Sequence, residues 1–348
     1  MQSNQKKPGN IQTPRSSERP SAKQQSILGR YQISIHRGVI ATTKDGKACV
    51  PRTSTMGKKG KKAQAGKPKK LTPKDVSKRL DALVKKLEQE LKGADLFAPL
   101  PPTDDCPICF VPLSRLLSKT LYKECCGTVV CIGCDRERDE LLGSSDNKVL
   151  HANCPFCREP DPTTIEELVR RTKARALKND PQALYIVGMY YDKGSDGLPV
   201  DKLKALHYWT RAAELGNPRA MTNIGVRYNH GEELPVDREK ATFFFRAAAL
   251  NGNIEGRHNL GITEYYDLGN HRVGIRHFKI AAEAGSQLSL NHLKRIYNGY
   301  GGSPRKDFIR KDTLDSLFRA CHDAQEQVKS EGREKHKEGE EDVYMFKC

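Results

Sequence analysis

The chain has 348 residues and a net charge of +17, with 36% hydrophobic and 30% charged residues. This length allows two or three modest domains, and the high polarity predicts that part of the chain buries too little apolar surface to fold. No apolar run reaches about 18 residues, so we expect no transmembrane helix. The first 20 residues lack an apolar segment, so we expect no secretory signal and a nuclear or cytoplasmic, intracellular protein. In such reducing compartments clustered cysteines bind metal more often than they form disulfides.

The positive charge is concentrated at the N-terminus. Residues 1–70 contain 17 Lys and Arg but two acidic residues, which gives this segment +15 and the remainder +2. The composition predicts a disordered basic tail over residues 1–71. Its densest stretch, residues 58–70, fits a nuclear localisation signal or a nonspecific nucleic-acid contact, and it fits a solubilising tail equally well.

An amphipathic helix is predicted over residues 72–93. Thr72 and Pro73 form a good N-cap and first turn, and the helix should run to about Lys92, where Gly93 ends it. Apolar residues recur at helical spacing along one stripe: Val76, Leu80, Leu83, Leu87 and Leu91. The stripe can pair with a second copy or pack within the chain, and its short length slightly favours the second alternative. A proline-rich linker follows at residues 99–102.

Eight of the eleven cysteines lie within residues 106–157. They are Cys106, Cys109, Cys125, Cys126, Cys131, Cys134, Cys154 and Cys157. A C-x2-C motif places two thiolates on one tight turn at a separation that suits a tetrahedral zinc ion. A lone motif would also fit redox chemistry, whereas three such motifs and an adjacent pair supply the eight ligands that two zinc ions need.

Residues 104–160 resemble a RING finger, because CPIC and CPFCR match the opening and closing motifs of that family. The resemblance implies a cross-brace with two Zn²⁺ ions, in which alternate cysteine pairs share an ion. The first ion would be held by Cys106, Cys109, Cys131 and Cys134, and the second by Cys125, Cys126, Cys154 and Cys157. The usual pattern has histidine at the position of Thr128. The all-cysteine variant of the family has a cysteine at the place of Cys126, and Cys125 would then be its partner, with His151 as the reserve ligand.

The resemblance also implies a function. RING-type ligases have no nucleophile; they bind a ubiquitin-conjugating enzyme and hold its ubiquitin ready for attack. Carried over, Ile108 and Pro155 would contact that enzyme, and Arg158 would be the positioning linchpin. The alternative is that these three residues only pack and solvate the finger. An aromatic residue that many active members carry has no counterpart in residues 135–153, which leaves ligase activity open.

Residues 165–330 are predicted to form a solenoid of helical pairs. The sequence contains two similar copies of one unit, at residues 183–217 and 220–253. A third and less similar copy lies at 256–285, and a degenerate fourth copy lies at 289–330. The period of these copies indicates helical repeats. They resemble Sel-one-like repeats of the tetratricopeptide superfamily, which implies a groove for a substrate or partner protein. A scaffold without a dedicated ligand is the alternative. Residues 331–348 are predicted to be a charged, flexible tail.

Taken together, we expect a mainly α protein: a zinc-stabilised cross-brace followed by an α-solenoid. The expected function is a RING-type ubiquitin-protein ligase, with the finger docking the conjugating enzyme and the repeats the substrate. A noncatalytic adaptor is the alternative, and a nucleic-acid-associated factor is a less favoured one. The isolated Cys49, Cys321 and Cys348 are interpreted as ordinary free thiols.

Overall fold

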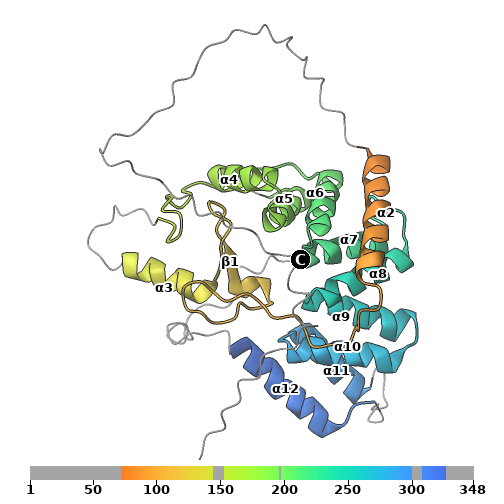
Figure 1. The fold of residues 1–348 in the computed structure, drawn as a ribbon. Helices are drawn as coiled ribbons and strands as arrows, with labels where there is room; N and C mark the ends of the chain where they lie inside the picture. The colour runs from red at the N-terminus through yellow and green to blue at the C-terminus, as the bar shows by residue number, and fades with distance from the viewer. Residues whose placement is uncertain (1–71, 144–152, 196, 300–307, 327–348) are drawn as a thin grey trace, which may run out of the picture. The chain divides into compact units, whose positions relative to one another are not determined.

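A computed structural model describes residues 72–143, 153–195, 197–299 and 308–326. The predictions for the basic tail and for residues 331–348 fall outside the described residues, as do Cys49, His151 and Cys348. Within the described ranges the chain is mainly helical (Figure 1). None of the helices in these ranges is both long and apolar enough to cross a membrane.

Helix α2 spans Pro73–Glu90 and begins as the sequence indicates. The Asp75 N–H donates to the Thr72 hydroxyl at 3.3 Å, and the Thr72 N–H donates to the Asp75 carboxylate at 3.2 Å. This reciprocal capping box satisfies two N–H groups that a helix start leaves without partners. The helix ends earlier than the predicted Lys92, because the turn completed by Gly93 (φ 77°) already begins at Leu91.

The apolar stripe of α2 packs within the chain, against α6 (Lys202–Glu214). Its four buried residues join the hydrophobic core of the repeats. Charged side chains flank this contact: Lys86 Nζ donates to the Glu214 carbonyl at 3.0 Å, and Lys240 pairs with Asp81 at 2.9 Å. The intramolecular alternative for the stripe therefore agrees with the structure, although Leu91 is only half-buried.

The finger is built on a two-stranded antiparallel hairpin. A 3-10 turn, η1 (Leu117–Lys119), leads into β1 (Thr120–Tyr122), which pairs with β2 (Val129–Cys131). The register places Thr120 opposite Cys131, and α3 (Ile132–Gly143) follows β2 without a break. The hairpin therefore carries Cys131 into the start of a helix.

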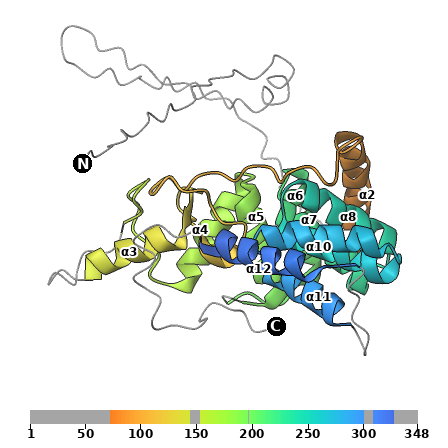
Figure 2. The ribbon, with the colours of Figure 1, turned by 90° about the horizontal axis from the view of Figure 1, so that it is seen from below.

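The remaining helices follow one another in chain order, and each contacts the next (Figures 1 and 2). They are α4 (Ile165–Leu177), α5 (Pro181–Lys193), α6, α7 (Pro218–His230), α8 (Arg238–Leu250), α9 (Ile254–Ile262), the π-helix η2 (Thr263–Asp267), α10 (His271–Glu283), α11 (Gln287–Asn298) and α12 (Lys311–Glu326). Nearest-neighbour packing of helical pairs is the arrangement of a solenoid.

Each of the first three pairs buries an aromatic ring against a glycine. A Cβ atom on Gly188 would lie 2.4 Å from Trp209 Nε1. The equivalent atoms on Gly225 and Gly261 would lie 2.7 Å from Phe245 and 2.8 Å from Phe278. The missing side chain lets the two helices of a pair approach closely enough to bury the ring, as the recurring glycines predict.

The third pair differs where its sequence lacks the LPVD loop. In the first two pairs the aspartate of that loop, Asp201 or Asp237, caps the second helix. In the third pair the first helix instead runs on as η2, and Asn270 makes no side-chain cap for α10. The fourth pair, α11 and α12, closes the array over a core that includes Leu293, Leu317 and the buried thiol of Cys321.

The segment before the finger is fixed to the third repeat. The ring of Phe97 stacks on His277, with 4.8 Å between centroids, and Arg257 donates to the Leu96 carbonyl at 2.8 Å. His277 is 0% exposed, and neither ring nitrogen has a hydrogen-bond partner among the described residues. Burial and the nearby charge of Arg257 lower the pKa of His277 to about 3.

Leu83→Asp tests the packing of α2. Leu83 is 2% exposed, so the variant would bury a carboxylate against apolar side chains and should lower the free energy of unfolding by about 2–4 kcal/mol. Urea denaturation followed by circular dichroism measures this, with the exposed neighbour Ala82→Asp as the matched control. Equal stability of the two variants would contradict the packing.

His277 should make stability depend on pH. Its pKa is about 3 when folded and about 6.5 when unfolded, so the unfolded chain binds the extra proton between these values. The stability is complete above pH 6.5 and is lost as the pH falls toward 3. His277→Phe keeps an aromatic ring at this position but does not titrate. Between pH 7.5 and pH 5 the free energy of unfolding should therefore fall by about 2 kcal/mol less in this variant than in wild type.

Urea denaturation at both pH values checks this expectation. The exposed His230→Phe is the control and should leave the pH dependence unchanged. His258, whose pKa burial lowers to about 4, should still supply its own share in every variant. A pH dependence that is the same in wild type and His277→Phe would show that His277 is not protonated on unfolding.

Candidate metal centre

The first C-x2-C motif lies on a tight turn within CPICFVP, residues 106–112. The Cys106 N–H donates to the Val111 carbonyl at 2.9 Å, and the Phe110 N–H donates back to the Cys106 carbonyl at 2.8 Å. Phe110 has a φ of 57°, so its backbone is left-handed. These bonds hold the thiols of Cys106 and Cys109 on the same side of the turn, as both belong to one cluster of sulfur atoms.

The last motif, within CPFCREP at residues 154–160, repeats this geometry. The Cys154 N–H donates to the Glu159 carbonyl at 2.8 Å, and the Arg158 N–H donates to the Cys154 carbonyl at 2.9 Å. Arg158 has a φ of 63° and is therefore the backbone equivalent of Phe110. The shared pattern C-P-x-C-x-x-P thus forms the same turn twice.

A third turn of this kind carries the adjacent cysteines. The Lys123 N–H donates to the Thr128 carbonyl at 2.8 Å, and the Gly127 N–H donates to the Lys123 carbonyl at 2.7 Å. Gly127 supplies the left-handed backbone, with a φ of 83°. Lys123 therefore occupies the place of a first cysteine and Cys126 that of a second. No spacing rule for cysteines reveals this turn, because its first position holds no cysteine.

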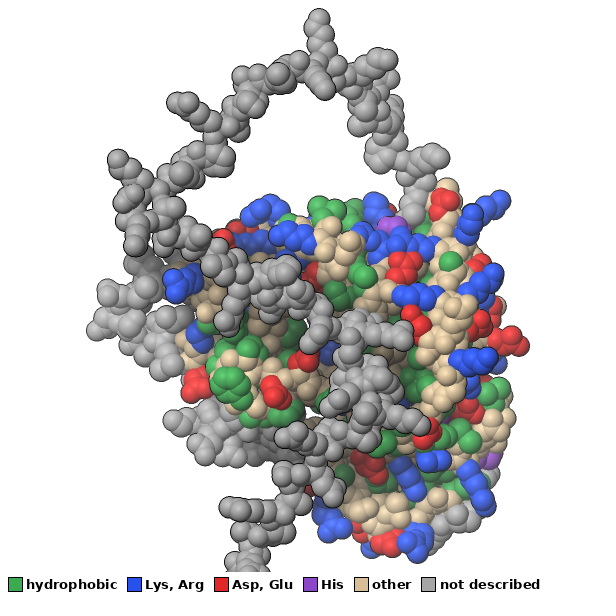
Figure 3. Space-filling model, in the orientation of Figure 1, with side chains coloured by type: hydrophobic (Ala, Val, Ile, Leu, Met, Phe, Trp, Pro, Cys, Tyr) green, Lys and Arg blue, Asp and Glu red, His purple; other side chains and the backbone are tan. Residues whose placement is uncertain are grey.

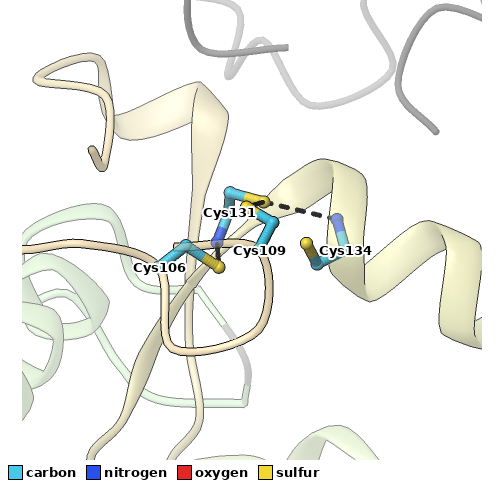
Figure 4. Close-up of side chains that lie close together, drawn as sticks. All are labelled: Cys106, Cys109, Cys131 and Cys134. Carbon is cyan, nitrogen blue, oxygen red and sulfur yellow. Dashed lines mark hydrogen bonds between the residues drawn. The ribbon is translucent and has the colours of Figure 1, made fainter. Parts of the chain in front are cut away.

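The first cluster gathers Cys106, Cys109, Cys131 and Cys134, whose sulfur atoms all lie within 4.8 Å of one another (Figure 4). Cys131 closes β2 and Cys134 lies in the first turn of α3. The sulfur atoms of Cys109 and Cys131 are 3.9 Å apart. That is too long for a disulfide of about 2.05 Å. It is close to the separation of about 3.8 Å that tetrahedral Zn–S bonds of about 2.3 Å produce.

The second cluster gathers Cys125, Cys126, Cys154 and Cys157 within the same limit of 4.8 Å. The sulfur atoms of Cys126 and Cys154 are 3.7 Å apart. Cys125 thus lies with the other three thiols, while Thr128 accepts a hydrogen bond from Cys126 at 3.2 Å. The structure brings all eight predicted cysteines together in the predicted two sets, and it describes no position for His151.

The two clusters favour a bound cation. Burial opposes the thiolate of Cys106, but the backbone N–H groups of Cys131, Cys109 and Ile108 outweigh it and lower its pKa to about 7. Burial and the neighbouring thiols raise the pKa of Cys134 and of Cys125. Four crowded thiols therefore do not all ionise by themselves. A metal ion in each cluster would supply the positive charge that lets them do so.

An ionic network joins the segments next to the second cluster. The buried Lys123 pairs with Asp135 of α3 at 2.7 Å, and Arg138 of the same helix pairs with Asp161 at 2.7 Å. Arg138 also lies 3.4 Å from Asp135. The network joins the third turn, α3 and the exit of the last turn, so it fixes how these three pieces meet.

The predicted contact residues Ile108, Pro155 and Arg158 are all exposed, on the first and last turns. Ile108 is 40% exposed. Two further exposed hydrophobic residues, Phe110 at 77% and Phe156, lie on the same turns, and the sequence analysis missed them. The feature that could have revealed them is the aromatic residue in each of the two C-P-x-C-x-x-P motifs. Figure 3 shows hydrophobic side chains at the surface of the finger, on the left of the view.

The finger also contacts the repeats directly. The Tyr122 hydroxyl donates to the Asp180 carboxylate at 2.8 Å, and Arg175 pairs with the same carboxylate at 2.8 Å. Further along, Arg115 donates to the carbonyls of Gly252, at 3.1 Å, and of Pro101. Between these contacts lies a groove of about 590 Å³. No sequence pattern indicated that residues so far apart would line one groove.

Comparison with known proteins identifies the repeats. The family model described as Sel1 repeat matches residues 181–217, 218–253 and 254–286, and this match does not extend to the cysteine clusters. The chain therefore contains three Sel1 repeats, and the predicted Sel-one-like repeats are confirmed. Their occurrence indicates a protein that binds other proteins.

One curated relative is the ERAD-associated E3 ubiquitin-protein ligase component HRD3A of Arabidopsis thaliana, which is 39% identical over 57 residues. That match covers 16% of this chain and 8% of the relative. A solved Sel1 repeat protein from Oxalobacter formigenes is 24% identical over 46% of this chain and 64% of its own, with a TM-score of 0.39. The protective antigen c5321 of uropathogenic Escherichia coli is 24% identical over 44% and 33%, with a TM-score of 0.38.

The ligand sets predict the metal content of variants. Each chain should bind two metal ions, and Cys125→Ser should reduce this to about one, because a four-coordinate site loses one thiolate. Elemental analysis of purified protein measures the ratio. Cys321→Ser is the matched control, since this buried cysteine lies outside both clusters. Two tightly held ions in Cys125→Ser would show that another group, such as His151, completes the second site.

Proposed function

We propose that this chain is a RING-type ubiquitin-protein ligase whose finger binds two Zn²⁺ ions and docks a ubiquitin-conjugating enzyme, while its Sel1 repeats bind the substrate. One observation carries the proposal: two four-thiol clusters whose members alternate along the chain. Because of this alternation, each ion would join two cysteine pairs that are separated in the sequence by a pair of the other cluster. Such an arrangement fits a structural cross-brace better than a redox site, which would need only one C-x-x-C pair.

The residues fit zinc on chemical grounds. All eight donors are sulfur atoms, and four thiolates in a tetrahedral set are typical of zinc or of an iron–sulfur cluster. Four protein ligands leave no open position for substrate, so bound zinc would supply folding energy and not a reactive centre. The chemistry of the ligase must then come from how the finger positions its partners.

Docking would use the first and last turns. Ile108 and Pro155 present exposed apolar atoms there, as a recruiting surface requires. Arg158 has its backbone N–H tied to Cys154, while its guanidinium makes no hydrogen bond or ion pair with the described residues. Because its backbone is fixed and its guanidinium has five available N–H donors, Arg158 could contact the conjugating enzyme and the attached ubiquitin at the same time. Holding the thioester in one reactive pose is catalysis by orientation.

The repeats support the substrate-binding half of the proposal. The Arabidopsis relative is named as a component of an E3 ubiquitin-protein ligase, which supports a link between this chain and ubiquitin ligation. In this chain the finger and the repeats share contacts through Tyr122 and Asp180. A substrate held on the repeats would therefore lie at a restricted distance from an enzyme held on the finger.

A noncatalytic adaptor is the second candidate. The Sel1 repeats indicate protein binding whether or not the finger is active, and the same exposed turns would serve a plain contact. A ligase assay with a panel of conjugating enzymes separates the two, since only the ligase forms ubiquitin chains. The nucleic-acid proposal depends on the basic tail, which lies outside the described residues.

Arg158→Ala tests the positioning role. The variant should slow ubiquitin discharge from the conjugating enzyme by about ten- to a hundredfold, because it removes roughly 1.4–2.7 kcal/mol of transition-state stabilisation. Zinc content should not change, since the side chain holds no metal. Arg170→Ala, at an exposed arginine of α4, is the matched control and should behave as wild type. Equal discharge rates for Arg158→Ala and wild type would refute the linchpin role.

Ile108→Ala separates docking from positioning. The variant removes exposed apolar area from the first turn, so it should weaken recruitment and be partly rescued at a high concentration of conjugating enzyme. Discharge rates measured against that concentration distinguish the two kinds of defect. If wild-type protein is inactive with every conjugating enzyme of the panel, the ligase proposal fails and the adaptor takes its place.

A further inference from the structure

The groove between the finger and the repeats has an apolar floor with a basic margin. The apolar residues that form this floor include Leu113, Tyr122, Tyr185, Ile186 and Met189, which come from the hairpin region and from α5. Asparagine side chains at the ends of the repeat helices add hydrogen-bonding groups. A volume of about 590 Å³ and this mixture of surfaces suit several residues of an extended peptide.

The charges at the margin are unbalanced. Among the described residues that line the groove, Arg115, Lys193 and Arg219 are basic, and Asp104 supplies the one carboxylate. Arg115 donates to main-chain carbonyls, and Arg219 donates to the Arg115 carbonyl at 3.4 Å. Within the described part of the chain, neither arginine forms an ion pair with a carboxylate. An occupant with acidic side chains would provide these partners.

The end of α12 lies beside this margin. Ala324 lines a second cavity, of about 420 Å³, together with Leu113, Ser114 and Arg115, and these three residues also line the groove. The end of the helix is fixed there, since Gln325 donates to the Gly285 carbonyl at 2.9 Å. The chain beyond α12 therefore starts next to Arg115.

The sequence beyond α12 has the chemistry that the groove lacks. Residues 338–342 read EGEED, with four acidic residues and no base, and residues 343–346 read VYMF. The eleven residues 327–337 can span about 36–40 Å when extended, which is ample for a start beside the groove. We propose that residues 338–346 of this chain dock in its own groove, with the acidic residues at Arg115 and Arg219 and the apolar residues on the floor.

Docking of this kind would make the segment an internal competitor for any partner of the repeats. The basic N-terminal segment has the wrong charge for the same site. An external acidic and apolar peptide would have to displace a segment that is tethered and hence present at a high effective concentration, of order millimolar for a short tether. The proposal concerns binding alone and stands whether or not the finger is a ligase.

The test uses the full chain and a fluorescent peptide with the sequence of residues 336–347. In one variant the chain's own segment is reversed in charge by Glu340→Lys, Glu341→Lys and Asp342→Lys. Fluorescence anisotropy should show that the peptide binds this variant at least about tenfold more tightly than wild type, whose tethered segment competes. Adding Arg219→Glu should weaken binding to the variant by about tenfold or more, whereas adding Arg170→Glu, outside the groove, should not.

Several outcomes would overturn the proposal. They are equal affinity for wild type and the charge-reversed variant, no binding to either, or no effect of Arg219→Glu. Lys193→Glu, at an exposed position on the same margin, replaces Arg219→Glu if that variant loses helical signal. Light scattering completes the test: a wild-type dimer that the charge reversal converts to monomer would place the segment in a second copy and refute docking within the chain.

Discussion

The finger depends on the crowding of eight thiols into two clusters, each of which could hold a metal ion. Its own hydrophobic core is small, with Val130, Leu113 and Leu121 packed among the cysteines, so apolar burial alone contributes little. Hydrogen bonds from backbone N–H groups to the Cys106 and Cys131 sulfur atoms, at 3.4 Å each, prepare two of the thiols. Burial and the neighbouring thiols raise the pKa of Cys134 and of Cys125, so a bound cation would favour the thiolate forms of these two side chains. Backbone hydrogen bonds close the individual turns, and a metal ion in each cluster would hold the turns together.

The two C-P-x-C-x-x-P turns show how a structural constraint can leave residues available for contact. A left-handed backbone is unfavourable for a non-glycine residue by about 1–2 kcal/mol, yet Phe110 and Arg158 both adopt it. Neither side chain is buried to offset this cost. The turns leave Phe110 and Arg158 exposed at equivalent places, near opposite ends of the finger sequence. Both belong to the surface on which the proposed function depends.

The repeats support the finger with a larger buried core than its own. Gly188, Gly225 and Gly261 allow close helix pairing, and α2 covers α6 with its apolar stripe. The finger meets this support at Asp180, an N-cap of α5 that also accepts from Tyr122. Gly127 lies so close to the support that a Cβ there would be 2.1 Å from Arg175. The interface therefore constrains the groove between the two parts.

The sequence by itself determined the features whose cause is local: the α2 capping box and stripe, the glycine and aromatic periodicity of the repeats, and the presence of eight clustered cysteines. The division of these cysteines into two sets came from the resemblance to RING fingers. The sequence analysis missed the β1–β2 hairpin, since three-residue strands carry too short a pattern, and the third turn, since Lys123 stands where a cysteine would. Only the tertiary structure decided that Arg115 meets Gly252 and that α12 ends beside the groove. These contacts join residues far apart in the chain. They follow from the packing of preformed units, for which a linear pattern carries no signal.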